Sequence, residues 1–320
     1  MTEPLLEIRG LTVRYGARLA TWEVSLTLRP GEVLGLVGES GAGKSTVGRA
    51  IVRLLPESGR IEAGQIRFKG RDLLALPEAE MRRLRGADIA LVPQDPLSAL
   101  NPAFRVGLQA TDALCLHRGL SRRLAEAELV GLLGRMGIPE PADVLRRYPH
   151  ELSGGMRQRV LIAMAFSCGP SLLIADEPTT ALDVTTQAQI LRLLEGLRAE
   201  RDVATLFVTH DLGLVAHRAH TVALMYAGCV VELAPARALF AAPAHPYTQA
   251  LLTQVPRADR RAEAPEVLEG LMPSLQAVPR ACPFRERCPK RMAVCDEVMP
   301  PLGALASGHL VACHLYEGGR

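Results

Sequence analysis

Residues Gly38–Ser45 read GESGAGKS and fit the pattern G-x-x-x-x-G-K-[ST]. An apolar run, Val33–Val37, precedes them and predicts a strand. A helix is expected from Ser45 to Leu55, because its apolar residues fall on one face and Pro56 follows. Glycines in such a turn let backbone N–H groups approach an anion, and the start of a helix adds partial positive charge. The segment therefore predicts a phosphate-binding loop, and the alternative is an ordinary glycine-rich turn.

The same pattern assigns roles to individual residues. Lys44 can reach the β and γ phosphates of a nucleotide, and Ser45 offers an oxygen to Mg²⁺. The nucleotide contacts predicted in this loop are Gly38, Ser40, Gly41, Gly43, Lys44, Ser45 and Thr46.

A second candidate is the apolar run Leu172–Ala175, which predicts a strand ending in two carboxylates, Asp176 and Glu177. An aspartate at this place can orient Mg²⁺ or its waters, and the glutamate can act as general base for an attacking water. Strands that end in acids are common. Only the pairing with the phosphate loop makes these two residues catalytic candidates.

The spacing of apolar residues predicts an α/β chain. Short β-branched runs such as Ile89–Val92 indicate strands up to about Pro96, with one helix among them. Helical spacing follows, with amphipathic stretches at Leu124–Met136 and Met156–Phe166. Strand-like runs return at Thr205–Val208 and Thr221–Tyr226, after a helix expected over Thr186–Arg201.

These parts suggest a division into domains. We expect a nucleotide-binding core formed by 1–96 and 171–240, and a helical subdomain at 97–170. Six prolines between 243 and 279 indicate a linker, so residues 241–320 are expected to form an appended C-terminal module.

The bulk composition narrows the class of partner. The chain has 37 basic and 34 acidic side chains and a net charge of +3, so no strongly basic surface for nucleic acid is expected. No secretory signal is visible at the N-terminus, and no apolar run approaches the roughly 20 residues of a membrane-spanning helix. We expect a cytosolic chain that reaches a membrane only by docking.

The segment Leu152–Gln158 reads LSGGMRQ and stands at the start of an expected amphipathic helix. It resembles the signature of ABC-type ATPases, although Ser-Gly-Gly alone would indicate only a helix cap. The resemblance covers about Leu5 to Phe240. It implies ATP hydrolysis with Mg²⁺ on an ABC-type P-loop fold, a RecA-like core with an antiparallel β subdomain and a helical subdomain. It also implies a head-to-tail dimer in which Ser153, Gly154 and Gly155 contact the partner's nucleotide.

Further positions match this family in order. The resemblance implies that Gln94 touches Mg²⁺, that His210 contacts the γ-phosphate and that Tyr15 stacks on adenine. Ala181–Asp183 matches the loop that contacts the partner in the dimer. Taken singly, Tyr15 and His210 would be ordinary surface or core residues. The implied catalytic residues are Glu177, His210 and Gln94, and the implied Mg²⁺ ligands are Ser45, Gln94 and Asp176.

Four finer details resemble the oligopeptide, dipeptide and nickel importer branch of the family. They are the segment Asp95–Pro102, the methionine after the signature glycines, the run Asp176–Thr185 and the segment His245–Thr248. The branch implies a second, homologous ATPase subunit, two permease subunits and an extracytoplasmic solute-binding protein. It implies a peripheral place at the cytoplasmic face of the membrane. The solute stays open, with peptides first and nickel, glutathione or other small solutes as alternatives.

Four of the seven cysteines lie close to the C-terminus, at Cys282, Cys288, Cys295 and Cys313. Four thiolates in a short module suit a tetrahedral iron or zinc arrangement. Similar ATPase subunits carry a [4Fe–4S] cluster here, and the resemblance implies one on these four residues. Zinc and unligated cysteines are the two alternatives.

Two rival functions fit the sequence less well. A nucleic-acid or ribosome-handling ABC ATPase generally has two cassettes or long coiled-coil insertions, whereas this chain has one cassette and too few residues between Ser45 and Ser153 for a coiled coil. Exporter cassettes usually carry an acidic, glycine-containing loop before the signature, where this chain reads RRYPHE at Arg146–Glu151. Import without a nucleic-acid partner is therefore expected.

Overall fold

The computed structural model describes residues 3–180, 182–254 and 269–316. These residues pack as two compact units. The first unit combines Met1–Leu74 with Leu206–Arg320, and the second is Ala75–Thr205. This division by packing is not the three-part division expected from the sequence, which stays a prediction.

The first unit contains an antiparallel sheet in the order β2-β1-β4-β5. Its strands are β1 (Leu6–Tyr15), β2 (Arg18–Leu28), β4 (Gly59–Phe68) and β5 (Arg71–Asp72). Side chains along the end of β2 alternate between buried and exposed, as expected for a strand with one face on the core. The antiparallel β subdomain that the resemblance implies is therefore present.

The second sheet of this unit has the order β11-β12-β10-β9-β3-β8. Its strands are β3 (Val33–Val37), β8 (Ala204–Thr209), β9 (Thr221–Tyr226), β10 (Cys229–Pro235), β11 (Gly303–Ala306) and β12 (His309–Val311). The C-terminal segment of this unit begins within β8. Strand β3 runs parallel to β9, and all five residues of β3 are buried, as in a sheet covered on both faces. Because β12 pairs with β10, the C-terminal residues extend the sheet that carries the phosphate loop.

Short helices complete the first unit. They are α1 (Lys44–Ile51), α9 (Leu212–Ala216), α10 (Ala236–Ala241), α11 (Pro246–Thr253) and α12 (Val294–Glu297). Helix α11 lies inside the stretch that the sequence assigned to a linker. Pro246 occupies its first turn, where proline is favoured, and the His245 side chain caps it. The linker prediction is wrong at this helix, and its prolines 256 and 265 lie outside the described residues.

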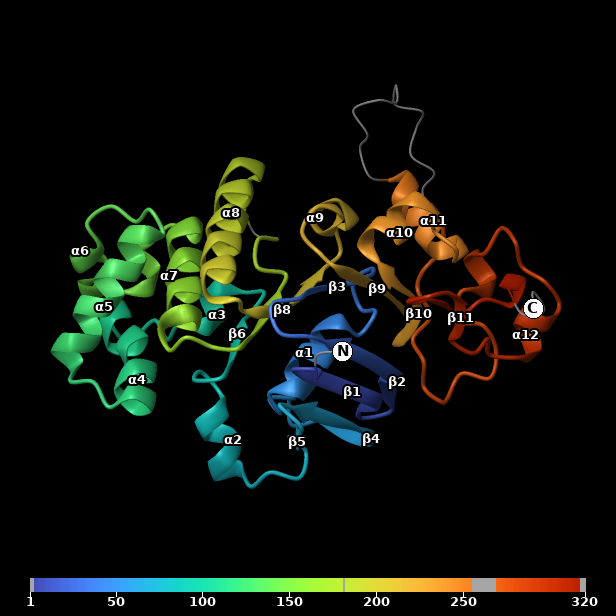
Figure 1. The fold of residues 1–320 in the computed structure, drawn as a ribbon, viewed down its shortest axis with the longest axis horizontal. Helices are drawn as coiled ribbons and strands as arrows, with labels where there is room; N and C mark the ends of the chain where they lie inside the picture. Colours follow the sequence, from blue (N-terminus) through green and yellow to red (C-terminus); the bar gives the residue numbers. More distant parts are fainter. Residues whose placement is uncertain (1–2, 181, 255–268, 317–320) are drawn as a thin grey trace. The chain divides into compact units, whose positions relative to one another are not determined.

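The second unit places helices around two parallel strands, β6 (Ile89–Val92) and β7 (Leu172–Asp176). The helices are α2 (Glu78–Leu84), α3 (Pro96–Ala99), α4 (Val106–Arg118), α5 (Arg122–Arg135), α6 (Pro141–Arg146), α7 (Gly154–Ser167) and α8 (Val184–Arg201). Helices α4 to α7 pack on one another, and α7 also contacts α8 and β6 (Figure 1). The sequence predicted α5, α7 and α8 but not α2.

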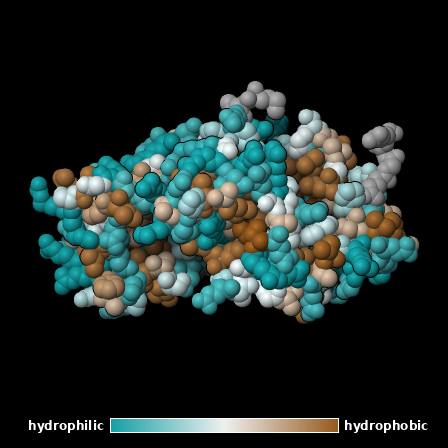
Figure 2. All heavy atoms as spheres, turned by 90° about the horizontal axis from the view of Figure 1, so that it is seen from below, coloured by the Kyte–Doolittle hydropathy of each residue, from teal (hydrophilic) through white to brown (hydrophobic). Residues whose placement is uncertain are grey.

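Apolar side chains of the second unit also reach solvent. Leu97 is 61% exposed, Phe104 48% and Leu108 43%. Figure 2 shows hydrophobic residues in separate brown patches on one mostly hydrophilic face of the molecule. No helix in the described ranges is long and apolar enough to cross a membrane.

Candidate nucleotide site

The phosphate loop connects β3 to α1, as predicted. A Cβ atom at position 38 would lie 2.2 Å from the carbonyl oxygen of Met225, and one at position 43 would lie 2.3 Å from that of Ala20. Gly43 also has a φ of 101°, a backbone conformation that residues with a side chain rarely adopt. Glycine is thus required at both positions by the close approach of neighbouring backbone.

Lys44 is the first residue of α1, and its side chain bends back over the loop. It is buried, with 4% of its surface exposed. Its Nζ atom donates hydrogen bonds to the carbonyl oxygens of Gly38 at 2.8 Å and Glu39 at 3.0 Å. The ammonium group is therefore held at the loop by two backbone acceptors.

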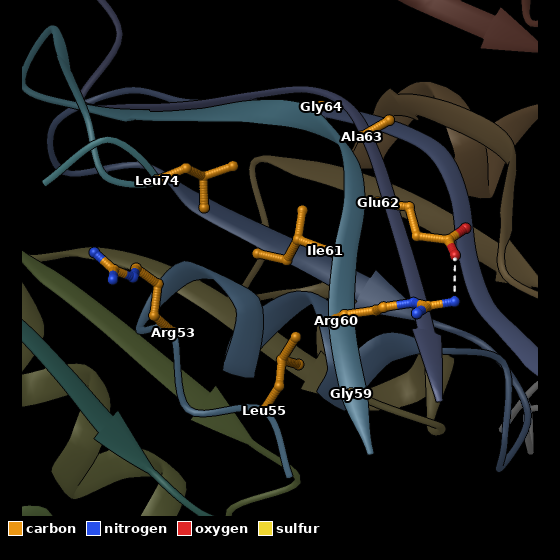
Figure 3. A pocket seen from close by; sticks show the side chains of 9 residues that line it. All are labelled: Arg53, Leu55, Gly59, Arg60, Ile61, Glu62, Ala63, Gly64 and Leu74. Carbon is orange, nitrogen blue, oxygen red and sulfur yellow. Dashed lines mark ion pairs between the residues drawn. The ribbon is translucent and has the colours of Figure 1, made fainter. Parts of the chain in front are cut away.

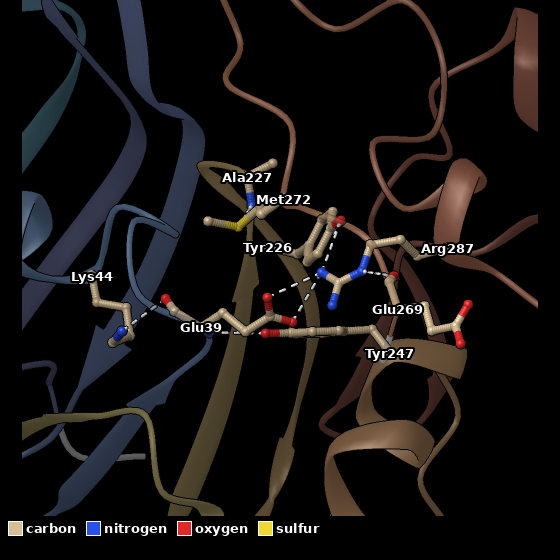
Figure 4. Close-up of polar contacts among 8 residues, drawn as sticks. All are labelled: Glu39, Lys44, Tyr226, Ala227, Tyr247, Glu269, Met272 and Arg287. Atoms are coloured by element: carbon tan, nitrogen blue, oxygen red, sulfur yellow. Dashed lines mark hydrogen bonds and ion pairs between the residues drawn. The ribbon is translucent and has the colours of Figure 1, made fainter. Parts of the chain in front are cut away.

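Residues from the C-terminal part of the chain hold the other side of Glu39 (Figure 4). Arg287 Nη1 donates to both carboxylate oxygens of Glu39, each at 3.0 Å. The backbone N–H of Glu39 donates to the Tyr247 hydroxyl at 2.9 Å. Burial raises the pKa of Tyr247, so that the hydroxyl stays neutral.

Two predicted residues of the first unit lie outside this loop, at the end of β1 and after β8. Tyr15 ends β1, and the Arg18 guanidinium, just after the turn, donates to the carbonyl of Gly41 at 3.2 Å. His210 is exposed directly after β8. Asp211 follows it and caps α9 by accepting from the N–H of Gly213 at 2.7 Å.

In the second unit, Asp176 and Glu177 stand at the end of β7, as predicted. Both are buried, with 3% and 8% exposed. Glu177 Oε2 accepts hydrogen bonds from Gln94 Nε2 and from the Thr180 hydroxyl, each at 3.0 Å. The structure thus joins two of the three predicted catalytic residues, Gln94 and Glu177, in one hydrogen-bonded group.

The signature segment of the same unit begins α7. The Ser153 side chain caps the helix by accepting from the N–H of Met156 at 3.3 Å. A Cβ on Gly155 would lie 3.0 Å from Thr186, in the first turn of α8, so the two helix starts are neighbours. Asp183 caps α8, and the N–H of Thr186 lowers the pKa of Asp183. Ala181, in the segment matched to the dimer loop, lies outside the described residues.

These two units match known proteins in sequence and in structure. The ABC transporter family pattern matches residues 22–180, and the pattern of the oligopeptide/dipeptide transporter C-terminal region matches 231–295. The dipeptide transport ATP-binding protein DppD of Bacillus subtilis is 46% identical over 98% of this chain and 96% of its own length. The chain is an ABC-family ATPase of the oligopeptide and dipeptide transport group.

Further relatives of this ATPase agree. The oligopeptide transport ATP-binding protein OppD of Salmonella typhimurium is 47% identical over 97% of this chain and 93% of its own length. Among solved structures, the ATP-binding cassette MJ0796 bound to ADP and Pi is 26% identical, covers 72% of this chain and 99% of its own and has a TM-score of 0.65. The cbiO1 protein of Clostridium perfringens is 25% identical, covers 75% and 91%, and has a TM-score of 0.63.

The predicted four-cysteine metal site is not supported by the geometry. Within the described ranges, which include all four residues, no three His, Cys, Asp or Glu side chains lie close enough to hold a metal ion. The backbone N–H of Cys282 nevertheless bonds to the carbonyl of Cys295 at 2.9 Å. Burial raises the pKa of the Cys282 thiol to about 11, and the other three cysteines add to this rise. The four thiols are therefore electrostatic neighbours without being a ligand set as they stand.

A pocket of about 470 Å³ in the first unit holds none of the predicted site residues. It lies between the end of α1 and β4 and is lined by Arg53, Leu55, Gly59, Arg60, Ile61, Glu62, Ala63, Gly64 and Leu74 (Figure 3). An ion pair between Arg60 and Glu62 occupies one side of it. Nucleotide binding is accordingly not assigned to this pocket.

Three residues that the structure connects around the phosphate loop, Glu39, Tyr247 and Arg287, are not indicated by the sequence patterns. Glu39 occupied a variable place in the loop pattern. Tyr247 belonged to a segment that was used only to choose the branch of the family. No local signal pointed to Arg287, because its partner Glu39 is 248 positions away in the chain.

Proposed function

We propose that this ATPase is the subunit that energises uptake of di- and oligopeptides by a membrane importer, from the cytoplasmic face of the membrane. One observation carries the proposal. Identity of 45–47% to dipeptide and oligopeptide transport ATP-binding proteins extends over nearly the full chain, including the C-terminal region.

The phosphate loop suits the phosphates of a bound nucleoside triphosphate. Its backbone passes so close to its neighbours that only glycine fits at 38 and 43, and the ammonium of Lys44 is kept at the loop. We assign Gly38, Ser40, Gly41, Gly43, Lys44 and Thr46 to the phosphates of ATP, and Tyr15 to adenine. Ser45, Gln94 and Asp176 supply the oxygen ligands that Mg²⁺ prefers. When bound, Mg²⁺ neutralises charge on the phosphates.

Glu177 is the proposed general base. It is buried, and the amide of Gln94 and the hydroxyl of Thr180 fix one of its carboxylate oxygens. A carboxylate held in this way can accept a proton from the attacking water. His210 is assigned to the γ-phosphate.

The partners follow from the family and from the exposed surfaces. Ser153, Gly154 and Gly155 form a helix start suited to an anion, and we assign them to the nucleotide of a second, homologous ATPase subunit in a heterodimer. The solved structure of the related cassette MJ0796 is dimeric. Exposed apolar side chains at Leu97, Phe104 and Leu108 follow Gln94 and suit docking on two permease subunits, served by an extracytoplasmic solute-binding protein.

A [4Fe–4S] cluster on Cys282, Cys288, Cys295 and Cys313 belongs to the proposal on the resemblance to similar ATPase subunits, with zinc or unligated cysteines as the alternatives. The assay is iron, sulfide and zinc analysis of full-length chain purified without oxygen, with Cys282→Ser as the test variant and Cys115→Ser as the control. The proposal expects four irons per chain that are lost in the Cys282 variant only. Stoichiometric zinc, or no metal, would contradict it.

The solute class is tested by uptake in cells that lack this gene. Labelled dipeptide, nickel and glutathione are supplied in turn, and the gene is then restored. Peptide import predicts that only dipeptide uptake falls and recovers. Loss of nickel or glutathione uptake alone would move the assignment to that solute and leave the ATPase role intact.

A further inference from the structure

Glu39 is the meeting point of the phosphate loop and the C-terminal part of the chain. Its carbonyl oxygen accepts from Lys44 Nζ at 3.0 Å. Its carboxylate is bonded to Arg287, and its backbone N–H to Tyr247. Three different groups of one residue therefore connect the nucleotide-binding lysine to two residues more than 200 positions downstream.

Arg287 is itself held firmly on its far side. Its Nε donates to the carbonyl of Glu269 at 3.0 Å, and its Nη1 reaches the Tyr226 hydroxyl at 3.3 Å. Only 6% of its side chain is exposed, against 30% for Glu39. Burial alone would lower the pKa of Arg287, but the hydrogen bonds that Arg287 donates to Glu39 and Tyr226 raise it above its ordinary value. The Arg287 guanidinium is thus held in place, and within the phosphate loop it binds Glu39.

Aromatic side chains pack beside Arg287, whose guanidinium carbon lies 5.7 Å from the centre of the Tyr226 ring. The rings of Tyr226, Tyr247 and Phe284 meet edge to face, with centroids 4.9 to 5.5 Å apart. All three side chains are fully buried. Met272 adds a second contact, because its Sδ accepts from the N–H of Ala227 at 3.3 Å, and a Cβ at position 41 of the loop would lie 3.4 Å from its Cε. Residues from the end of β9 and from the C-terminal region thus pack together beside the loop.

We infer that Arg287 and Tyr247 are positioning residues for the phosphate loop, which act through Glu39 on Lys44 and so set the affinity for MgATP. The inference rests on the proposed role of Lys44 in binding the phosphates of ATP. It assigns to the C-terminal region of this ATPase a part in the nucleotide site.

Two physical effects make the affinity for MgATP depend on Arg287. Arg287 neutralises the carboxylate of Glu39, which would otherwise repel a bound polyphosphate. The guanidinium also binds Glu39, Glu269 and Tyr226 at once, which a lysine ammonium with its flexible stem cannot do with the same geometry. Loss of Arg287 therefore leaves a negative charge beside the nucleotide and frees the loop segment whose carbonyl holds Lys44.

The test is a double-mutant cycle in the full-length chain. MgATP affinity is measured by calorimetry for the unaltered chain, Arg287→Met, Glu39→Gln and the double variant. Arg287→Met is expected to weaken binding about 10-fold, within the usual range for coupling between two sites. Glu39→Gln is expected to restore most of that loss in the Arg287→Met background, so the two effects do not multiply. Multiplicative effects, or unchanged binding by Arg287→Met, would overturn the inference.

Three further variants separate positioning from folding. Tyr247→Phe keeps the ring in its cluster and removes only the acceptor for Glu39, and it should weaken MgATP binding about 3-fold, the size of one modest hydrogen bond. Arg287→Lys should bind more tightly than Arg287→Met. Arg280→Met removes an exposed arginine of the same region and should bind like the unaltered chain. An unaltered chain that fails to bind MgATP would instead contradict the proposed function.

Discussion

The side-chain amide of Gln94 donates a hydrogen bond to Oε2 of Glu177 at 3.0 Å. Gln94 follows β6 and Glu177 follows β7, so two neighbouring parallel strands bring the pair together from positions far apart in the sequence. The backbone of Glu177 has a φ of 45°, which costs a residue with a side chain about 1–3 kcal/mol. Such a conformation persists only where the surrounding structure holds the residue in place.

Replacement of Glu177 by Gln should stop turnover and keep binding. The amide has nearly the same shape as the carboxylate but cannot accept the proton of the attacking water. Hydrolysis should fall about 100-fold or more, the usual contribution of a general base, while MgATP affinity changes little. Steady-state hydrolysis and calorimetry, both with the partner subunit present, give the two quantities. Hydrolysis close to that of the unaltered chain would show that another group is the base.

Replacement of Gln94 by Ala should slow hydrolysis by a smaller factor. Glu177 would keep its bond to Thr180 but lose the one that fixes it from the neighbouring strand. We expect kcat to fall about 10-fold, which corresponds to one hydrogen bond to a charged group. Thr180→Val removes the other donor and should act in the same direction. If neither variant changes kcat, the observed bonds do not orient the base.

Replacement of Gly38 by Ala should abolish MgATP binding. The added Cβ would lie 2.2 Å from the carbonyl oxygen of Met225, so the loop must move. Overpacking of this kind destabilises a protein by about 1–3 kcal/mol. Gly196→Ala is the matched control, since a Cβ there meets open space within α8, and it should stabilise the fold by about 0.5–1 kcal/mol. Equal nucleotide affinity of the two variants would contradict the account of the loop.

The buried His245 should make the folded state sensitive to acid. Burial lowers the pKa of His245 from its ordinary value of 6.5 to about 3. The unfolded chain therefore binds the proton more tightly, and stability contributed by the neutral ring is present above pH 6.5 and falls as the pH drops towards 3. The loss should amount to a few kcal/mol.

His245→Asn tests this dependence without removal of the helix cap. In the unaltered chain, His245 Nδ1 accepts a hydrogen bond from the N–H of Tyr247 at 3.0 Å. The side-chain oxygen of Asn can accept the same hydrogen bond. Urea unfolding between pH 7 and pH 4 should show a weaker pH dependence for the variant than for the unaltered chain. The exposed His217→Asn serves as control and should follow the unaltered chain. The same pH dependence of stability in all three proteins would exclude His245 as the source of the acid sensitivity.

Local patterns predicted the parts of the fold that depend on neighbours in the sequence. The strands expected at Val33–Val37, Ile89–Val92 and Thr221–Tyr226 are confirmed with the same bounds. Each is a short apolar run, which predicts a buried strand. The prolines around α11 suggest a linker, but Pro246 stands in the first turn of that helix, where proline favours helix formation.

Contacts between distant residues could not be predicted in the same way. The loop pattern identified Lys44, but it treats Glu39 as variable, and nothing near Arg287 in the sequence indicates a partner. The pairing depends on tertiary contacts, in which Arg287 also donates to the carbonyl of Glu269 and to the hydroxyl of Tyr226. The spacing of the four cysteines likewise suggested a metal site that the described geometry does not support.

The most direct test of the account is uptake of a labelled dipeptide by cells that lack this gene and carry either the normal chain or the Glu177→Gln form at equal level. The account predicts that uptake falls on deletion, returns with the normal chain and stays absent with the variant. Uptake that survives deletion, or that Glu177→Gln restores, would contradict the claim that this chain drives peptide import by hydrolysing ATP.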